Sequence, residues 1–372
     1  MALKLDKDSL PEKEKRRQER GYRLGFEEGY RVGACNAIVK RALPFQPSQT
    51  WNRRILYVGS GKGMPYSPLD SAIIDIMRPL VLELKVTEPL DNVVAWVEIT
   101  KPDLVLVLDG MLFPVEQIDA IRAKGVQTAL WLTDDPYYTD VTVGFAPHYD
   151  HVFTLELNCV TFYKEHGCSN VHYLPLGVHP GWFCPRATNL MNRREICFVG
   201  SGYWKRVELF DQIAPYLKGR DVCISGLWWD RLKAYRLLKD KIRLNHWMGA
   251  EETAGFYNGT KIVINLHRSH DDGTFNYNSR LIKAVSPNPR TFEISACGVL
   301  QLTDVRDDLA SFYKPGRDLA TFGSAEELVE QIDYYLTHEE QHLQVALQGL
   351  RSTMEQHTFA HRLTQLFQTV FK

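Results

Sequence analysis

The tetrapeptide Val-Gly-Ser-Gly occurs twice in this chain, each time at the end of a short apolar run. It occupies residues 58–61 and again residues 199–202. A strand that enters a glycine turn is the opening of an α/β nucleotide-type domain. The repeat therefore predicts two similar α/β halves with a cleft between them, and 372 residues are enough for two such cores.

Alternating apolar and amphipathic segments extend this prediction along the chain. In the first half, strands are expected at 54–58, 103–108, 128–132, 151–155 and 172–176, with helices at 115–124 and 158–166. In the second half, strands are expected at 196–199, 222–225, 244–248, 261–266 and 299–302. Helices are expected there at 207–217, 251–258, 328–336, 341–356 and 361–371. The prolines and polar residues that follow residue 180 predict an interdomain linker.

Residues 9–43 predict one long helix that stops before Pro44. Glycines recur at 21, 25, 29 and 33, and Tyr22, Phe26 and Tyr30 recur beside them at the same spacing of four. Each glycine costs a helix roughly 1 kcal/mol relative to alanine, so we expect a compensating close contact. Docking or self-association would supply it, and packing on its own chain is the alternative. Charged residues within the stretch exclude a membrane-embedded GxxxG dimer.

Composition excludes several classes of protein. The chain has 44 basic and 45 acidic side chains, so no overall field recruits nucleic acid or an anionic membrane. No apolar run approaches a membrane span, and the charged start lacks a signal-peptide core, so a cytoplasmic location is expected. Seven cysteines without a C-x-x-C pair predict reduced thiols in the core.

The stretch 286–304 places a proline-defined loop, a basic residue, a carboxylate and a glycine before a strand. Its prolines predict a helix that starts near Arg290, with Thr291 as the N-cap. The free N–H groups there, with Arg290, suit a diphosphate, and Glu293 on the first turn suits a sugar-type diol. The alternative is a capped helix that merely packs on a sheet.

The run R-T-F-E-I-S-A-C-G-V-L-Q-L-T-D at 290–304 follows an Asn-rich loop and precedes a G-R-D-L segment and an E-E-L-V-E-Q-I helix. It resembles the C-terminal half of the CgeB-like (spore maturation) glycosyltransferases of the GT-B superfamily. The resemblance implies two Rossmann-like domains facing a cleft, with an N-terminal helical extension in this chain. It further implies that Glu293 binds the ribose of a nucleotide-sugar. Many retaining relatives carry a second acid where this chain has Val285, which leaves the stereochemical outcome open.

The resemblance and the composition together give four predicted segments. Residues 1–50 form the N-terminal helix and linker, 51–184 the acceptor domain, and 195–357 the nucleotide-sugar domain. Residues 358–372 form a final helix that crosses back to the first domain.

Several further residues are candidates for the site. Asp134 and Asp135 follow the strand at 128–132, so either could act as general base on an acceptor hydroxyl; a turn that caps the next element is the alternative. His148 or His151 could serve instead, and Asp271 or Asp272 could supply the acid missing at Val285. Candidate nucleotide-sugar ligands are Gly200, Ser201, Gly202, Lys205, Arg206, Met248, Asn265, His267, Arg280, Arg290, Thr291, Phe292 and Glu293. Trp228 and Trp229 suit either stacking on a ligand or core packing.

The leading hypothesis is a metal-independent glycosyltransferase without a resident cofactor, which uses a nucleoside-diphosphate sugar, preferably UDP-linked. His267 and His270 have no further ligand set around them, so no metal is expected. The acceptor is unidentified; a spore-surface or cell-surface glycan or protein is considered, with the enzyme in the mother-cell cytoplasm or spore-associated. No nucleic acid and no membrane span are expected. A nucleotide-sugar epimerase of the same fold and a non-catalytic spore-coat scaffold are the alternatives.

Overall fold

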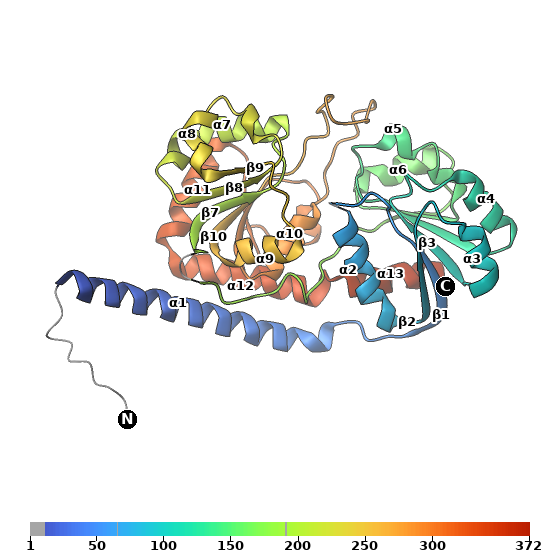
Figure 1. Cartoon of the computed structure of the whole chain (residues 1–372), viewed down its shortest axis with the longest axis horizontal. Helices are drawn as coiled ribbons and strands as arrows, with labels where there is room; N and C mark the ends of the chain where they lie inside the picture. Colours follow the sequence, from blue (N-terminus) through green and yellow to red (C-terminus); the bar gives the residue numbers. More distant parts are fainter. Residues whose placement is uncertain (1–11, 65, 190–191) are drawn as a thin grey trace.

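The computed structural model describes residues 12–64, 66–189 and 192–372. It contains two α/β halves side by side, each built on a six-stranded sheet (Figure 1). The strand pairs within both sheets run parallel. This arrangement confirms the predicted α/β fold class with two similar halves.

The sheet of the first half has the order β2-β1-β3-β4-β5-β6. Its strands are β1 (Trp51–Val58), β2 (Val81–Thr87), β3 (Leu104–Leu108), β4 (Gln127–Trp131), β5 (His151–Thr154) and β6 (Val171–Tyr173). The helices are α2 (Ser67–Met77), α3 (Val93–Thr100), α4 (Val115–Ala123), α5 (Thr139–Thr142) and α6 (Leu157–Glu165). Along β3, Leu104 and Leu106 belong to one buried cluster and Val105 and Val107 to another. Both sheet faces are therefore covered, which explains the continuous apolar run.

The sheet of the second half has the order β12-β11-β10-β7-β8-β9. Its strands are β7 (Arg194–Val199), β8 (Val222–Gly226), β9 (Ile242–Leu244), β10 (Thr260–Asn265), β11 (Leu300–Asp304) and β12 (Ala320–Phe322). The helices are α7 (Trp204–Lys218), α8 (Tyr235–Leu238), α9 (Ala250–Asn258), α10 (Pro289–Ala296), α11 (Ala325–Thr337) and α12 (Glu339–Gln356). The strand order reverses between β7 and β10, and ligands of open α/β sheets bind at such a point.

Most predicted elements are present, but several boundaries are wrong. The strand expected at 244–248 ends at Leu244, because Asn245 adopts a left-handed conformation with φ of 55° and the chain continues as loop. Helix α7 begins at Trp204 rather than residue 207, which puts Arg206 inside its first turn. Elements α2, β2 and α3 lie in a region for which no element was predicted.

The last helix, α13 (Phe359–Val370), returns to the first half. Leu363, Leu366 and Phe367 share a buried cluster with residues of the first sheet. The chain crosses between the halves where Val178 bridges Thr358. A Cβ atom at Gly177 would lie 2.8 Å from backbone atoms of residues 358 and 359, so this crossing requires glycine.

The N-terminal helix α1 (Glu12–Ala42) lies along α12 and extends past it (Figure 1). The long helix is confirmed, whereas its expected start at residues 9–11 lies outside the described residues. One face is held to the second half: Glu28 pairs with Arg31 and Arg193, and Cys35 packs against Gly298. The glycine and aromatic strips lie on the outer face, with nothing within 4 Å of a Cβ at any of the four glycines.

Two further expectations concern the cysteines and membrane spans. All seven cysteines are free thiols, six of them buried, which confirms the expected core thiols. Among the described helices, none combines the length and apolar character of a membrane span.

Candidate functional site

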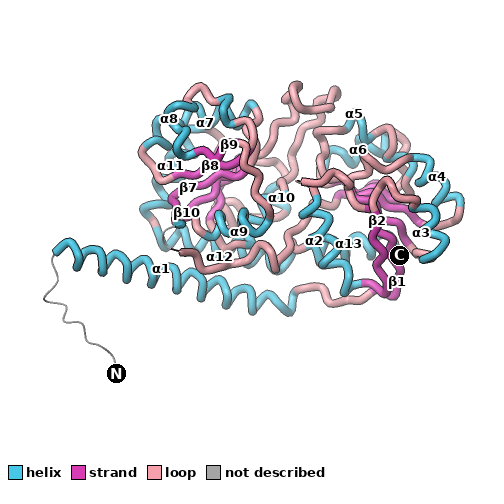
Figure 2. Tube along the Cα trace, viewed as in Figure 1, coloured by secondary structure: helices cyan, strands magenta, loops and turns pink. Residues whose placement is uncertain are grey.

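A cleft of about 350 Å³ lies between the two halves. Its walls come from the loops after β4 and β5 in the first half and the loops after β7, β8, β9 and β10 in the second, together with the start of α10. A long loop, residues 266–288, runs from the second half to the first (pink in Figure 2). Its Tyr277 exchanges backbone hydrogen bonds with Tyr137 and Asp140. The cleft is thus built from both halves at once.

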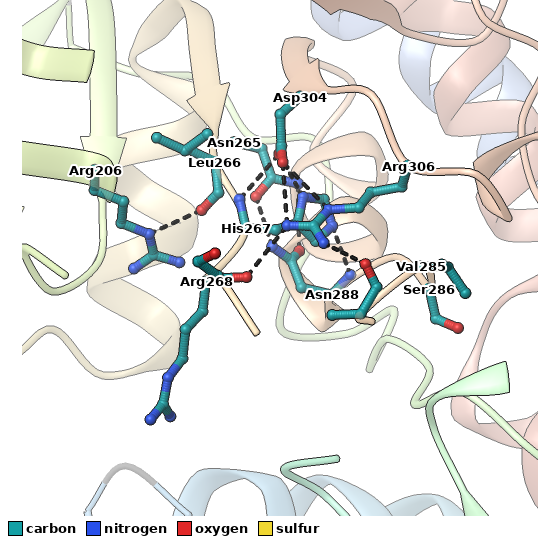
Figure 3. Close-up of polar contacts among 12 residues, drawn as sticks. Arg206, Asn265, Leu266, His267, Arg268, Val285, Ser286, Asn288, Asp304 and Arg306 are labelled. Atoms are coloured by element: carbon teal, nitrogen blue, oxygen red, sulfur yellow. Dashed lines mark hydrogen bonds and ion pairs between the residues drawn. The ribbon is translucent and has the colours of Figure 1, made fainter. Parts of the chain in front are cut away.

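Arg206 joins the loop after β7 to the loop after β10, at the point where the second sheet reverses its strand order. Its Nε donates to the carbonyl of Leu266 at 2.9 Å (Figure 3). Its Nη1 donates to the carbonyl of Ser201 at 3.0 Å. Burial, reinforced by the nearby charge of Arg290, lowers the pKa of Arg206 to about 9. Among the described residues, no carboxylate lies within ion-pair distance of either arginine. An anion that entered the cleft would relieve this uncompensated charge.

The glycine turn after β7 packs directly on the end of β8. A Cβ at Gly226 would lie 2.1 Å from the carbonyl oxygen of Gly200, so the two backbones touch. Gly200 and Ser201 line the cleft, and Arg206 holds the Ser201 carbonyl. The turn is therefore fixed in place beside the anion site.

Helix α10 starts earlier than the sequence predicted. Asn288, not Thr291, is the N-cap: its side chain accepts from the Thr291 N–H, and Pro289 occupies the first helical position. Asparagine is a strong N-cap and proline is favoured at the first position, so this pair outcompetes the threonine. Glu293 consequently lies in the second turn, which corrects the expected first-turn position.

A buried network fixes the loop that precedes α10. His267 Nδ1 lies 2.5 Å from Asp304, while its Nε2 accepts from the Asn288 N–H at 2.9 Å (Figure 3). Burial lowers the pKa of His267, whereas the pKa of Asp304 is lowered to about 2, since hydrogen bonds from His267 and the charge of Arg306 outweigh burial. Because Nε2 accepts a hydrogen bond, it carries no proton; the imidazole is neutral and both its nitrogens are occupied. His267 positions the N-cap of α10.

Arg290 and Glu293 both face the cleft from α10. Burial raises the pKa of Glu293, and Arg290 opposes that rise. No hydrogen bond from another described residue engages the Glu293 carboxylate. It is free to accept bonds from a ligand.

Arg268 is a cleft residue that was not among the candidates selected from the sequence. It is 8% exposed, and its guanidinium lies 4.5 Å from the ring of Tyr137 and 4.6 Å from that of Tyr203. Its Nε has no hydrogen-bond partner among the described residues. Figure 3 shows its side chain directed away from the His267 network. A third cation therefore faces the cleft without a carboxylate partner.

The two candidate bases of the first half have different environments. Asp134 lines the cleft and accepts from the Tyr66 hydroxyl at 2.5 Å; burial raises its pKa, and the Tyr66 bond opposes this. Asp135 is 2% exposed, and its oxygens accept from Thr154 at 2.6 Å and Tyr163 at 2.8 Å. Burial raises the pKa of Asp135 to about 7. Asp134 has the more available carboxylate.

Glu156 is a cleft residue that sequence reasoning missed. It caps α6, and its Oε2 accepts from the backbone N–H groups of Val285 and Ser286 at 3.0 and 3.1 Å. It directly follows the strand β5 and Leu155, so the rule that selected Asp134 would also have found it. A carboxylate from the first half thus meets the backbone at position 285, where this chain lacks an acidic side chain.

Several predicted residues lie outside the cleft lining. Lys205 is exposed and pairs with Asp271 at 3.4 Å, and Arg280 lies over Phe162 of the first half. Buried residues that brace α10 or the core instead are Asn265, Thr291 and Phe292. The other candidates outside the lining are Gly202, His148, His151, Asp271, Asp272, Trp228 and Trp229. Met248, His267, Gly200 and Ser201 do line the cleft.

Comparison with known proteins shows which proteins this chain resembles. A family model described as "Glycosyl transferase-like" matches residues 205–368. The spore protein CgeB of Bacillus subtilis (strain 168) is 28% identical over 311 residues, which cover 82% of this chain and 95% of that protein. The chain is similar to the CgeB-like glycosyltransferases.

Solved structures confirm the GT-B architecture. The Anabaena protein HepE, in complex with UDP-glucose, superposes with a TM-score of 0.60 at 12% identity, over 86% of this chain and 100% of that one. A Listeria monocytogenes protein assigned as a UDP-N-acetylglucosamine 2-epimerase superposes with a TM-score of 0.56 at 13% identity, over 86% and 97%. A glycosyltransferase from Rickettsia africae superposes with a TM-score of 0.57 at 12% identity, over 86% of this chain and 99% of that one. The fold is thus shared by a transferase and a protein assigned as an epimerase, while the family model favours a transferase.

Proposed function

We propose that this protein transfers a sugar from a UDP-sugar to an acceptor bound by the first half. The observation that carries the proposal is the set of Arg206, Arg290 and Glu293 around one cleft at the strand-order reversal of the second sheet. Two cations without carboxylate partners suit a diphosphate, and the free carboxylate suits the ribose hydroxyls.

The leaving diphosphate is the group that needs stabilisation in this reaction. Arg206 is fixed by two backbone carbonyls, so its charge is already oriented before the bond to the sugar breaks. Preorganised charge of this kind acts most strongly in a cleft that excludes water. These protein cations support a reaction without a resident metal or cofactor.

The acceptor hydroxyl must lose a proton as it attacks the anomeric carbon. Asp134 lies on the opposite wall of the cleft from α10, and one of its oxygens is held by Tyr66. Its pKa is raised by burial, which makes the carboxylate a stronger base than an exposed aspartate. We assign Asp134 as the general base. Asp135 instead stabilises the turn that follows β4.

Calorimetric titration with UDP tests the donor site. Glu293→Ala should weaken UDP binding by about 1–3 kcal/mol, because the ribose would lose its hydrogen-bond acceptor. Glu330→Ala, at an exposed position of α11, is the matched control and should bind UDP as the wild type does. Equal affinity in Glu293→Ala and the control would remove the ribose role.

Incubation with a panel of UDP-sugars separates transfer from epimerisation. Slow release of UDP without added acceptor is expected of a transferase, through attack of water on the donor. Interconversion of two UDP-sugars without release of UDP would instead establish the epimerase alternative. If the protein binds none of UDP, GDP and dTDP, only the alternative of a non-catalytic scaffold remains.

A further inference from the structure

The outer face of α1 carries an aromatic ridge, Tyr22, Phe26 and Tyr30, whose residues are 77%, 64% and 61% exposed. The rings of Phe26 and Tyr30 stack, with centroids 6.5 Å apart and an interplanar angle of 17°. Beside the ridge runs a glycine groove, residues 21, 25, 29 and 33, with no atom close to a built Cβ. A helix face that only meets water would gain stability from alanine or charged residues at these positions.

Within the described part of the chain, no other segment covers this face. The opposite face of α1 already holds the second half through Glu28, Cys35 and Ala42, all of which are buried. Glu28 accepts hydrogen bonds from Arg193 and from the Thr188 N–H. These contacts direct the ridge and the groove outward.

We propose that a second copy of the chain covers this face, with the two α1 helices antiparallel. A two-fold axis between residues 25 and 26 places each ridge residue opposite a groove glycine of the other copy: Phe26 faces Gly25, Tyr22 faces Gly29 and Tyr30 faces Gly21. All three pairs follow from this one register. A face that fits itself in this way produces a closed dimer.

The geometry agrees with known helix packing. Ridges and grooves formed by residues four apart interdigitate at a crossing angle of about −50°, the commonest class in globular proteins. Glycine in the groove lets the backbones approach, and each ring then fills the space that a side chain would otherwise occupy. In a parallel pair, the two-fold axis would place the aromatic ridge of one helix against the aromatic ridge of the other.

Charge also favours the antiparallel arrangement. The first turn of α1 carries Glu12 and Glu14, and its last turn carries Lys40 and Arg41. In the proposed register the acidic end of each helix is nearer to the basic end of the other helix than to its acidic end, whereas a parallel pair would bring the like-charged ends together. The opposed helix dipoles are attractive as well. The contacts of α1 with α12 and the cleft are untouched.

Sedimentation and light scattering of the full chain at about 1 to 100 µM, a range suited to weak dimers, test the proposal. A dimer is expected. Gly25→Leu should weaken dimerisation at least about tenfold because it fills the groove, although leucine favours the helix more than glycine does. Tyr334→Ser, which removes an exposed aromatic ring from α11, should leave the dimer intact. Unchanged circular dichroism and UDP binding would show that Gly25→Leu is folded.

Oxidative cross-linking tests the register. Gly25→Cys lies next to the proposed two-fold axis and should form a disulfide-linked dimer. Asn36→Cys is also exposed on α1 but lies far from its copy in this register, so it should remain uncross-linked. A monomeric wild type, a dimer that survives Gly25→Leu, or cross-linking at 36 but not 25 would overturn the proposal.

Discussion

The carboxylate of Glu156 accepts a hydrogen bond from the backbone N–H of Val285 at 3.0 Å, across the boundary between the two halves. Glu156 belongs to the first half and Val285 to the loop that leads into α10. The same oxygen also binds the next N–H along the chain. The first half therefore helps to set the position of α10.

Glu156→Gln should loosen this connection, because an amide provides one uncharged acceptor where the carboxylate provides two charged ones. Hydrogen bonds to charged groups contribute about 1.5–3 kcal/mol, so amide exchange at residues 285 and 286 should accelerate about 10- to 100-fold. Hydrogen exchange measured by mass spectrometry checks this. The exposed Glu165→Gln on α6 is the control, and equal exchange in both variants would contradict the role.

Asp134→Asn should lower kcat at least about 100-fold, because the acceptor proton would lose its base. Affinity for UDP should stay near the wild-type value, since Asp134 lies on the acceptor wall. Single-turnover assays with a UDP-sugar and calorimetry with UDP separate the two effects. The exposed Asp119→Asn should retain activity, and a fully active Asp134→Asn would reject the assignment.

Tyr66→Phe should change the pH profile. The Tyr66 hydroxyl donates to Asp134 and lowers its pKa, so without that bond the pKa rises further. A base with a higher pKa is protonated at higher pH, and the acidic limb of kcat/KM should therefore move to higher pH. An unmoved acidic limb would mean that a different group titrates in the assay.

Arg290→Ala should weaken binding of UDP about 10- to 100-fold and leave uridine binding unchanged, because uridine carries no diphosphate. The cleft-facing position of Arg290 is the reason for this difference. Lys205→Ala is a suitable control, since Lys205 is exposed and paired with Asp271 outside the cleft lining. Equal losses for UDP and uridine would point to a misfolded α10 instead of a lost diphosphate contact.

His357→Gln should flatten the dependence of stability on pH. Burial, and then Arg362, lower the pKa of His357 to about 3, and its Nε2 lies 3.0 Å from the Phe312 carbonyl. Between that value and the pKa of an unfolded histidine, about 6.5, only the unfolded chain binds the proton. Stability from this residue is therefore present above pH 6.5 and is lost as pH falls.

Urea unfolding at several pH values measures this contribution. Removal of the histidine should reduce the slope of the unfolding free energy below about pH 6.5 by up to about 1.4 kcal/mol per pH unit. Gln344→Ala, which removes no proton-binding group, should keep the wild-type slope. If the slope of the unfolding free energy against pH is unchanged in His357→Gln, His357 has the same pKa in the folded and unfolded states.

Local patterns predicted the strands and helices where one signal was dominant. The apolar run of β3 and the long helical stretch that ends before Pro44 in α1 are such cases. Where two local signals competed, as between Asn288-Pro289 and Thr291 at the start of α10, the sequence alone suggested the wrong cap. The side chain of Asn288 is also bonded to Asn265 on β10, a contact that no local pattern contains.

The sequence predicted which kinds of side chain line the candidate site, but it did not predict the full set of residues. The arginine and the glutamate of α10 follow from the helix start and from the family resemblance. His267 looked like a ligand, yet its two ring nitrogens bind Asp304 and Asn288 from distant segments. Glu156 follows the end of β5, so the rule that selected Asp134 could have found it. Arg268 reaches the cleft because the halves meet there, and the sequence of either half alone does not specify that meeting.

The return of α13 to the first sheet makes that half discontinuous along the chain. Its hydrophobic interior lacks Leu363, Leu366 and Phe367 until α13 has been synthesised. On the ribosome, the second half has its strands and covering helices first and can mature earlier. The first half therefore closes only after the second half has been synthesised, and a chain that stops near residue 356 should be an early target of proteases.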